Sequence, residues 1–322
     1  MSDCLIKTEN LKTHFSISSG LFRKTSEYLR AVDGVDITLN KGEIVAIVGE
    51  SGCGKSTLGN SLLGLVRPTS GSLFLNGEQI DIHNSSSWNL HRRNFQMIFQ
   101  DPISSLNPRH TVFEIISEPL LVHKICTKKE ARDRTAMLLK KVGLSPDYMN
   151  RYTHSFSGGQ KQRICIARII GLNPQAIICD EITAALDLSV QAQIIELLLD
   201  LKKEFGLSLL FISHDLSLVR SISQRIYVMY LGKIVEEAPS KEIFSNPSHP
   251  YTRALLDSIP VLEYRKRPAV LPGEIPSPVN PPNGCAFHTR CPSAAEKCLN
   301  VPPLFQKIES GNGSVFCHFP LS

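Results

Sequence analysis

The stretch GESGCGKST, residues 49–57, constrains the fold of this chain more than any other segment. It follows the apolar run EIVAIV and precedes LGNSLLGLV, which has the spacing of a buried helix. Its glycines can adopt backbone angles closed to other residues, so the N–H groups of the loop can turn inward around an anion. The frame is G-x-x-x-x-G-K-[ST] between a strand and a helix N-terminus. The sequence therefore predicts a phosphate-binding loop rather than a plain glycine-rich turn.

The motif also indicates the ligand. Lys55 is expected to reach the β- and γ-phosphates of a nucleoside triphosphate, and Ser56 is expected to hold Mg²⁺. The other candidate nucleotide-binding residues of the loop are Gly49, Ser51, Gly52, Cys53, Gly54 and Thr57.

Bulk composition narrows the class of protein. With 322 residues, 42% hydrophobic and 20% charged, the chain can form a large core and more than one domain. Its net charge of +5 comes without a long basic block, so the charge does not favour nucleic acid as a partner. No apolar run reaches the roughly 20 residues that span a bilayer, and the first ten residues do not resemble a signal peptide. We therefore expect the protein in the cytosol.

The pattern of elements predicts the architecture. Strand-like segments at 43–48 and 95–100 flank SLFLNGE, which contains an Asn76-Gly77 turn, and this favours a mainly parallel α/β sheet with an antiparallel addition. Thr127 and Glu130 form a capping box ahead of a helix at 131–142. Strand and helix alternation resumes over 176–230, so a helical insert divides one nucleotide-binding domain.

We expect two domains from this order. The first is an ATPase domain over residues 1–237, with a helical insert at about 101–172. The second is a C-terminal extension over 238–322, with a proline-rich linker at 271–284 and a small tail that contains four cysteines.

Two further segments carry chemistry. In AIICDE, Asp180 would hold Mg²⁺ at the end of an apolar strand, and Glu181 would polarise the attacking water. In SFSGGQKQR, a helix begins at Ser157, Gly158, Gly159 and Gln160, where free N–H groups and the helix dipole can bind a second anion. On spacing alone, the first of these segments could be a turn and the second a helix cap.

Taken in order, these motifs resemble those of the ATP-binding cassette (ABC) ATPases along nearly the whole chain. Gln100 in IFQDP looks like the Q-loop glutamine, which contacts Mg²⁺ and the attacking water, and His214 in FISHD looks like the switch histidine. Phe15 is the candidate for stacking on adenine, with Phe22 and Tyr28 as competitors. The resemblance implies ATP as the nucleotide.

The resemblance also implies a dimer, because the signature motif of one subunit closes over the nucleotide of the other. ITAALD, residues 182–187, resembles the D-loop region but departs from it twice: Ile182 stands where proline is usual, and Ala184 stands where serine is usual. Neither departure removes a metal ligand or the base, so we expect them to affect rate rather than activity.

The C-terminal half points to a subfamily. NPSHPYTRALLDSIP, LPGEIPSP and GCAFHTRCP, together with DPISSLNPR, resemble the ATPase subunits of dipeptide and oligopeptide importers. The resemblance implies the second ATPase of a non-identical pair, with a homodimer as the alternative, peripheral at the cytoplasmic face of the inner membrane. Two permeases, fed by an extracytoplasmic substrate-binding protein, would complete the importer. Import of nickel or glutathione is a second reading, and a soluble ABC ATPase that acts on nucleic acid is a third, disfavoured because it would need coiled-coil inserts or two cassettes.

Four of the nine cysteines gather in the tail with the spacing C-x₅-C-x₆-C-x₁₈-C: Cys285, Cys291, Cys298 and Cys317. A disulfide framework is not expected in the cytosol, and the usual zinc spacing C-x₂₋₄-C is absent. The longer spacers favour a [4Fe–4S] cluster over zinc, with unused thiols as the remaining reading. The importer resemblance supports the cluster. On the sequence alone, replacement of Cys291 and Cys298 by serine should leave ATP binding at Lys55 intact.

Overall fold

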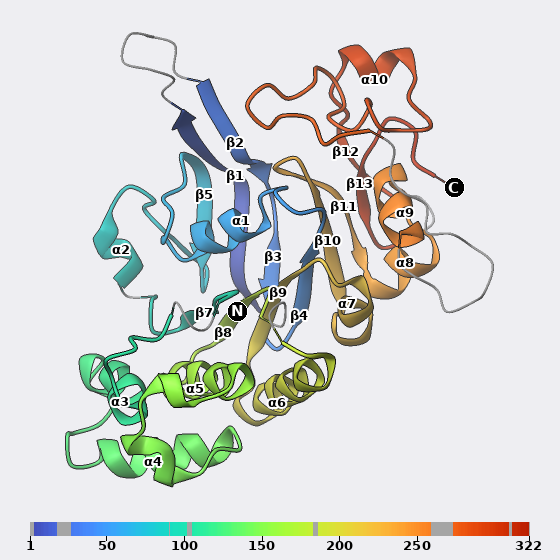
Figure 1. The fold of residues 1–322 in the computed structure, drawn as a ribbon. Coiled ribbons are helices and arrows are strands. Elements are labelled where there is room, and N and C mark those ends of the chain that lie inside the picture. The colour runs from blue at the N-terminus through green and yellow to red at the C-terminus, as the bar shows by residue number, and fades with distance from the viewer. Residues whose placement is uncertain are drawn as a thin grey trace. The chain divides into compact units, whose positions relative to one another are not determined.

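The computed structural model describes residues 3–17, 27–89, 91–101, 105–182, 186–258, 273–308 and 311–321. The chain divides into two compact units, one of residues 1–39, 44–85 and 211–322 and the other of residues 40–43 and 86–210. We call them the first and the second unit. Figure 1 gives the elements of both.

The first unit contains the strands β1 (Cys4–Ile17), β2 (Glu27–Val35), β4 (Ile44–Val48), β5 (Ser70–Leu75), β6 (Glu78–Gln79), β10 (Arg225–Tyr230), β11 (Lys233–Pro239), β12 (Phe305–Lys307) and β13 (Ser314–Phe316). Its helices are α1 (Lys55–Leu62), α7 (Leu216–Ile222), α8 (Ser240–Ser245), α9 (Pro250–Asp257) and α10 (Glu296–Asn300). The second unit contains β7 (Phe95–Ile98), β8 (Ala176–Asp180), α3 (Val112–Val122), α4 (Ala131–Lys141), α5 (Gly158–Ile170) and α6 (Leu188–Phe205). At the divisions between the units lie β3 (Thr38–Asn40), α2 (Ser85–Asn89) and β9 (Ser208–Ser213).

An antiparallel sheet forms one part of the first unit. Its strand order is β2-β1-β5-β6, with β3 beside β1. Between β5 and β6 the chain turns at Asn76 and Gly77, whose φ angles of 54° and 80° are both left-handed. Such angles suit the turn that joins two strands with a right-handed twist, and the expected Asn-Gly turn is confirmed.

A second set of strands in this unit has the order β12-β13-β11-β10-β4. β10 and β4 are parallel, with Tyr227 opposite Ile47. All five residues of β4 are buried, and a strand covered on both faces reads as an uninterrupted apolar run. The strand expected at 43–48 is therefore confirmed, and it ends at the glycine-rich loop.

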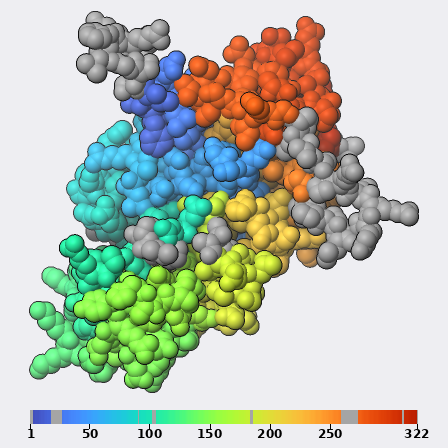
Figure 2. Space-filling model, in the orientation of Figure 1, coloured from blue at the N-terminus to red at the C-terminus, as the bar shows by residue number. Residues whose placement is uncertain are grey.

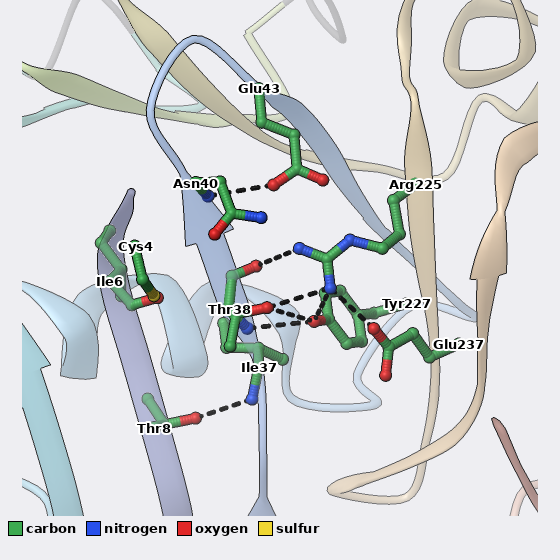
Figure 3. Close-up of polar contacts among 10 residues, drawn as sticks. All are labelled: Cys4, Ile6, Thr8, Ile37, Thr38, Asn40, Glu43, Arg225, Tyr227 and Glu237. Atoms are coloured by element: carbon green, nitrogen blue, oxygen red, sulfur yellow. Dashed lines mark hydrogen bonds and ion pairs between the residues drawn. The ribbon is translucent and has the colours of Figure 1, made fainter. Parts of the chain in front are cut away.

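A partly buried arginine of β10, Arg225, links β3 to β10 and β11 (Figure 3). Arg225 Nη1 donates to Tyr227 Oη and Glu237 Oε1, both at 2.6 Å, and Nη2 donates to the Thr38 carbonyl oxygen at 2.9 Å. Burial raises the pKa of Tyr227 to about 12, so its hydroxyl stays neutral in this network. The network fixes the start of β10, at the opposite end of the neighbouring β4 from the glycine-rich loop.

The second unit combines parallel strands with helices. β7 and β8 are parallel, with Met97 opposite Ile178, and α3, α4 and α5 pack on one another (Figure 1). The expected capping box ahead of α4 is confirmed, because the Thr127 N–H donates to Glu130 Oε2 at 2.8 Å and the Glu130 N–H donates to Thr127 Oγ1 at 3.4 Å. A helical stretch between the strands, as predicted, is present.

The C-terminal residues from 273 on pack against the rest of the first unit, as the orange and red atoms of Figure 2 show beside the blue ones. The Arg30 N–H of β2 donates to the Pro278 carbonyl oxygen at 3.2 Å. Residues 273–284 form neither helix nor strand, in agreement with the expected proline-rich linker, whose first two residues lie outside the described ones. Among the helices that the structure describes, none combines the length and apolar character needed to cross a membrane.

Candidate functional site

The glycine-rich loop is built for close backbone approach. Gly54, with a φ of 108°, caps the N-terminus of α1 without a side-chain hydrogen bond. A Cβ atom at Gly54 would overlap the Ala31 carbonyl oxygen, and one at Gly49 would overlap the Met229 carbonyl oxygen. Only glycine therefore fits at these two positions, and the loop ends at a helix N-terminus whose N–H groups can face an anion.

Lys55 is 4% exposed, and its ammonium group lies within the loop. Lys55 Nζ donates to the carbonyl oxygens of Gly49 at 2.9 Å and Glu50 at 3.0 Å. Burial raises the pKa of the neighbouring Cys53 thiol, although Lys55 opposes that shift, so this thiol stays neutral. A positive charge held on loop carbonyls, close to the N-terminus of α1, is the arrangement that a phosphate group requires.

The second unit brings the two candidate acids together with the Q-loop candidate. Asp180 ends β8 and is 5% exposed, and Glu181 follows it with a φ of 44°. Gln100 Nε2 donates to Glu181 Oε2 at 2.9 Å. A left-handed glutamate costs about 1 to 2 kcal/mol relative to an ordinary backbone, and such strain is retained where the surroundings hold it. Glu181, the proposed general base, is thus held in place by a hydrogen bond from Gln100.

The signature segment begins α5 with a capping box. Gln160 N–H donates to Ser157 Oγ at 3.4 Å, and the Ser157 N–H donates to Gln160 Oε1 at 3.1 Å. A Cβ atom at Gly159 would lie 2.5 Å from Val190 Cγ1, so α6 leaves no room for a side chain there. Ser157 and Gly158 are exposed. The cap reading and the anion-site reading of this segment are therefore compatible, because the serine caps the helix at its exposed end.

The remaining nucleotide candidates lie in the first unit. His214 is exposed and follows β9. Phe15 lies on β1 opposite Leu29 and is 38% exposed, and Tyr28 on β2, opposite Ser16, is 51% exposed. Both aromatic rings are accessible to a base, whereas Phe22 lies outside the described residues.

The two departures from the D-loop pattern have different outcomes. Ile182 is 4% exposed, so this side chain belongs to the core of the second unit. Ala184 lies outside the described residues.

The four tail cysteines line one cavity of about 10 Å³, together with His249, Phe287 and His318. Burial, with a smaller contribution from the other three thiols, raises the pKa of Cys317 to about 11, which shows that the four lie close together. The donor set suits a thiolate-bound group, and the cavity has room for about one water-sized atom. Among the described residues, however, no three or more His, Cys, Asp or Glu side chains are arranged to hold a metal ion. The four cysteines thus line one cavity, which is smaller than a four-iron cluster, and the metal-binding arrangement expected from the sequence is not seen among the described residues.

Sequence reasoning missed the loop residue Glu50 and two residues that hold it, Arg290 and Tyr251. Glu50 accepts two hydrogen bonds from Arg290, at 2.7 and 2.9 Å, and its N–H donates to Tyr251 Oη at 2.9 Å. Because these partners are 240 and 201 residues away along the chain, no local pattern indicates them.

Comparison with known proteins agrees with this geometry. Residues 32–184 match the ABC transporter family, and residues 235–298 match the C-terminal region of oligopeptide/dipeptide transporters. The chain is 49% identical to the oligopeptide transport ATP-binding protein AppF of Bacillus subtilis, over 98% of this chain and 97% of that protein. It is 48% identical to OppF of Salmonella typhimurium, over 94% of this chain and 92% of that protein. It is 45% identical to the dipeptide transport ATP-binding protein DppF of Escherichia coli, over 97% and 93%.

Solved structures show the same fold. One is cbiO1 of Clostridium perfringens, part of an ABC transporter complex, with a TM-score of 0.64 at 29% identity over 76% of this chain and 92% of that one. Another is the ATP-binding cassette MJ0796, a dimer bound to ADP and phosphate, with a TM-score of 0.65 at 29% identity over 73% of this chain and 99% of that one.

Proposed function

This chain belongs to the ATP-binding proteins of the ABC transporter family that carry the oligopeptide/dipeptide transporter C-terminal region, and from that premise we propose that it hydrolyses ATP to power peptide import. The observation that carries the proposal is the loop of residues 49–57, in which glycines admit close backbone approach and Lys55 is held on loop carbonyls. The relatives named above are oligopeptide and dipeptide transport proteins, which favours peptides over nickel, glutathione or nucleic acid as the substrate.

We assign the roles in nucleotide chemistry residue by residue. Lys55 and the loop N–H groups of residues 49–57 hold the phosphates, and Ser56, Gln100 and Asp180 would hold Mg²⁺. Bound Mg²⁺ supplies neutralisation of the phosphate charge. Glu181 accepts the proton of the attacking water, with the Gln100 amide fixing its carboxylate. His214 contacts the γ-phosphate, and Phe15 stacks on adenine, with Tyr28 as the described alternative.

The signature residues act on the nucleotide of a second cassette in this proposal. Cassettes of this fold dimerise, as the structure of MJ0796 illustrates. Ser157, Gly158, Gly159 and Gln160 begin α5 at an exposed helix N-terminus, which supports contact with an anion carried by another subunit. We propose a non-identical partner ATPase, with a homodimer as the alternative.

We place this pair at the cytoplasmic face of the membrane, beneath two permeases supplied by an extracytoplasmic binding protein. In this proposal, the permeases rather than this chain span the membrane and conduct the peptide. We retain the division into an ATPase domain over residues 1–237, with a helical insert at about 101–172, and an extension over 238–322. The match of residues 235–298 to the C-terminal region of the family supports this boundary.

For the tail, we propose that Cys285, Cys291, Cys298 and Cys317 together form a thiolate site for an iron–sulfur cluster, with zinc as the alternative. Four thiols that line one cavity support the site, and the other three help to raise the pKa of Cys317, a repulsion that a bound cation would relieve. Its role is structural in this proposal, since a short tail has few apolar residues of its own.

Reconstitution tests the proposed function. The isolated chain should hydrolyse ATP slowly, and addition of a homologous ATPase with both permeases in vesicles should raise turnover at least tenfold, because each donor of the closing signature motif is worth about 3 kcal/mol in the transition state. Peptide delivered by the binding protein should raise turnover further, whereas nickel or glutathione should not. Tight binding to vesicles without permeases, or to DNA with a steep salt dependence, would contradict the importer assignment.

A further inference from the structure

Every polar group of Glu50, which lies in the phosphate loop, is engaged by a different part of the first unit. Its N–H donates to Tyr251 Oη of α9 at 2.9 Å, and its carbonyl oxygen accepts from Lys55 Nζ at 3.0 Å. Its two carboxylate oxygens accept from Arg290 Nη1 and Nη2 at 2.7 and 2.9 Å. One residue thus connects the lysine of the loop with two residues of the C-terminal extension.

The contact between Arg290 and Glu50 has the geometry of a strong ion pair. The Arg290 side chain is 3% exposed and that of Glu50 is 22% exposed, so water screens the pair little. Two parallel N–H···O bonds fix the orientation of the carboxylate as well as its distance. The guanidinium also lies 5.9 Å from the centre of the Tyr230 ring. A lysine could supply the charge at this site but not the planar pair of donors.

Arg290 is itself held by the fold of the tail. It lies in the segment between Cys285 and Cys291, which also contains Phe287. Phe287 packs edge-on against Tyr230 and Tyr251, each with ring centres 5.3 Å apart, and all three rings are less than 2% exposed. The position of the guanidinium therefore depends on the tail being folded.

We propose that Arg290 is a positioning residue of the nucleotide site, which holds Glu50 so that the phosphate loop keeps its binding shape before nucleotide arrives. With the Glu50 peptide fixed on both sides, its carbonyl oxygen stays in place for Lys55, and the N–H groups that follow stay turned toward the ligand. The nucleotide site is then completed by the C-terminal extension. This inference rests on the proposed binding of ATP by the loop.

The test compares nucleotide affinity with stability in the full-length chain. Arg290→Met should weaken binding of a fluorescent ATP analogue about tenfold, and Arg290→Lys should recover part of the loss. Glu50→Gln, which keeps the size of the side chain and the backbone contacts, should weaken binding similarly. The double variant should bind no more weakly than the worse single variant, since both remove the same contact.

Arg225→Met is the matched control. It removes a partly buried arginine and its Glu237 ion pair from the same unit, at the end of β10 away from the phosphate loop. It should lower the denaturation midpoint and leave nucleotide affinity unchanged. If Arg290→Met and Arg225→Met have the same effect on both quantities, the Arg290 pair is only structural and the proposal is wrong.

Labelling of Cys53 in the absence of nucleotide gives a second readout. This thiol lies in the loop and is 5% exposed, so its alkylation, followed by peptide mass spectrometry, reports opening of the loop. Arg290→Met and Glu50→Gln should each speed alkylation of Cys53 several-fold, while Arg225→Met should not. Parental affinity together with a parental Cys53 rate in folded Glu50→Gln would overturn the proposal. If the parent protein binds no ATP, the proposed function fails, and the Cys53 rates still decide whether Arg290 holds the loop.

Discussion

Glu181 has a backbone conformation that a glutamate keeps only where its surroundings hold it. Glu181 has a φ of 44° and comes directly after the buried last residue of β8. Gln100, from a different segment of the second unit, donates a hydrogen bond to its carboxylate. We propose different roles for two residues of the site. Lys55 would contact phosphate in the ground state, whereas Glu181 would act on water during the reaction.

Replacement of these two residues should therefore give opposite results. Lys55→Ala should abolish binding of a fluorescent ATP analogue, because the buried ammonium group is lost from the loop. Glu181→Gln should keep binding and lower phosphate release by about 10² to 10⁴, the usual contribution of a general base. Glu181→Gln at the parental hydrolysis rate would show that the base has been assigned to the wrong residue.

The buried side chain of His249 should make stability depend on pH. Burial lowers the pKa of His249 from 6.5 to about 3, and its neutral Nδ1 accepts the Tyr251 N–H at 3.0 Å. Below about pH 6.5 this histidine is protonated in the unfolded chain but stays neutral in the folded protein. The free energy of unfolding should therefore fall by about 2 kcal/mol by pH 5. Burial raises the pKa of the adjoining Glu236, whose contribution has the opposite sign.

Urea denaturation of His249→Asn measures this contribution. Asparagine can still cap α9 but does not titrate in this range. The difference in stability between parent and variant should shrink on acidification from near pH 7 to near pH 5. A constant difference would show that His249 takes up its proton as readily in the folded protein as in the unfolded chain.

At the scale of elements, three helices of the second unit begin with a capping box, and the first is formed by Thr111 and Glu114 at α3. Thr127 and Glu130 cap α4, and Ser157 and Gln160 cap α5. The caps of α4 and α5 should stabilise their helices by similar amounts. Only Ser157 and Gln160, however, lie in the segment to which we assign nucleotide contact. A comparison of these two caps therefore distinguishes the effect of helix capping from that of nucleotide binding.

Thr127→Ala and Ser157→Ala should each lower the free energy of unfolding by about 1 kcal/mol, because each leaves a helix N–H without its partner. Only Ser157→Ala should also reduce ATP hydrolysis in the reconstituted assembly, by tenfold or more. Equal rates of ATP hydrolysis by Thr127→Ala and Ser157→Ala would show that Ser157 acts only as a helix cap.

At the scale of the whole chain, the extension and the phosphate loop form one structure in the first unit. The sequence alone predicts that the tail cysteines can be lost without effect on ATP binding. Arg290 is next to Cys291 and donates two hydrogen bonds to Glu50 in the loop. Unfolding of the tail should therefore displace Glu50 and weaken ATP binding.

Protein purified without oxygen should be brown and carry about four irons per chain if the tetrad holds the cluster. Cys291→Ser combined with Cys298→Ser should remove the metal, expose the tail to protease and weaken nucleotide binding severalfold. Cys126→Ser, a half-buried cysteine of the second unit, is the control and should change none of these. Colourless protein with one zinc would reject the cluster and keep the tetrad, and metal-free protein with a protease-resistant tail would reject both.

Local patterns allowed much of this protein to be predicted. The strand ending at Val48, the Asn76-Gly77 turn and the Thr127 capping box are each decided by residues within a few positions of one another, and all three are confirmed. The clustering of the four tail cysteines was also predictable, since thiols brought close in the sequence of a short tail have few other places to lie.

The sequence by itself thus determined the strand that enters the phosphate loop, the Asn76-Gly77 turn, the helix at 131–142 and the family, because propensity, glycine geometry and motif order act over short stretches of chain. Only the tertiary structure decided what surrounds that loop. The partners of Glu50 come from positions 251 and 290, and the hydrogen bond between Gln100 and Glu181 joins residues 81 positions apart. Such contacts depend on how strands and tail pack to bury their apolar faces, which no spacing within a motif records.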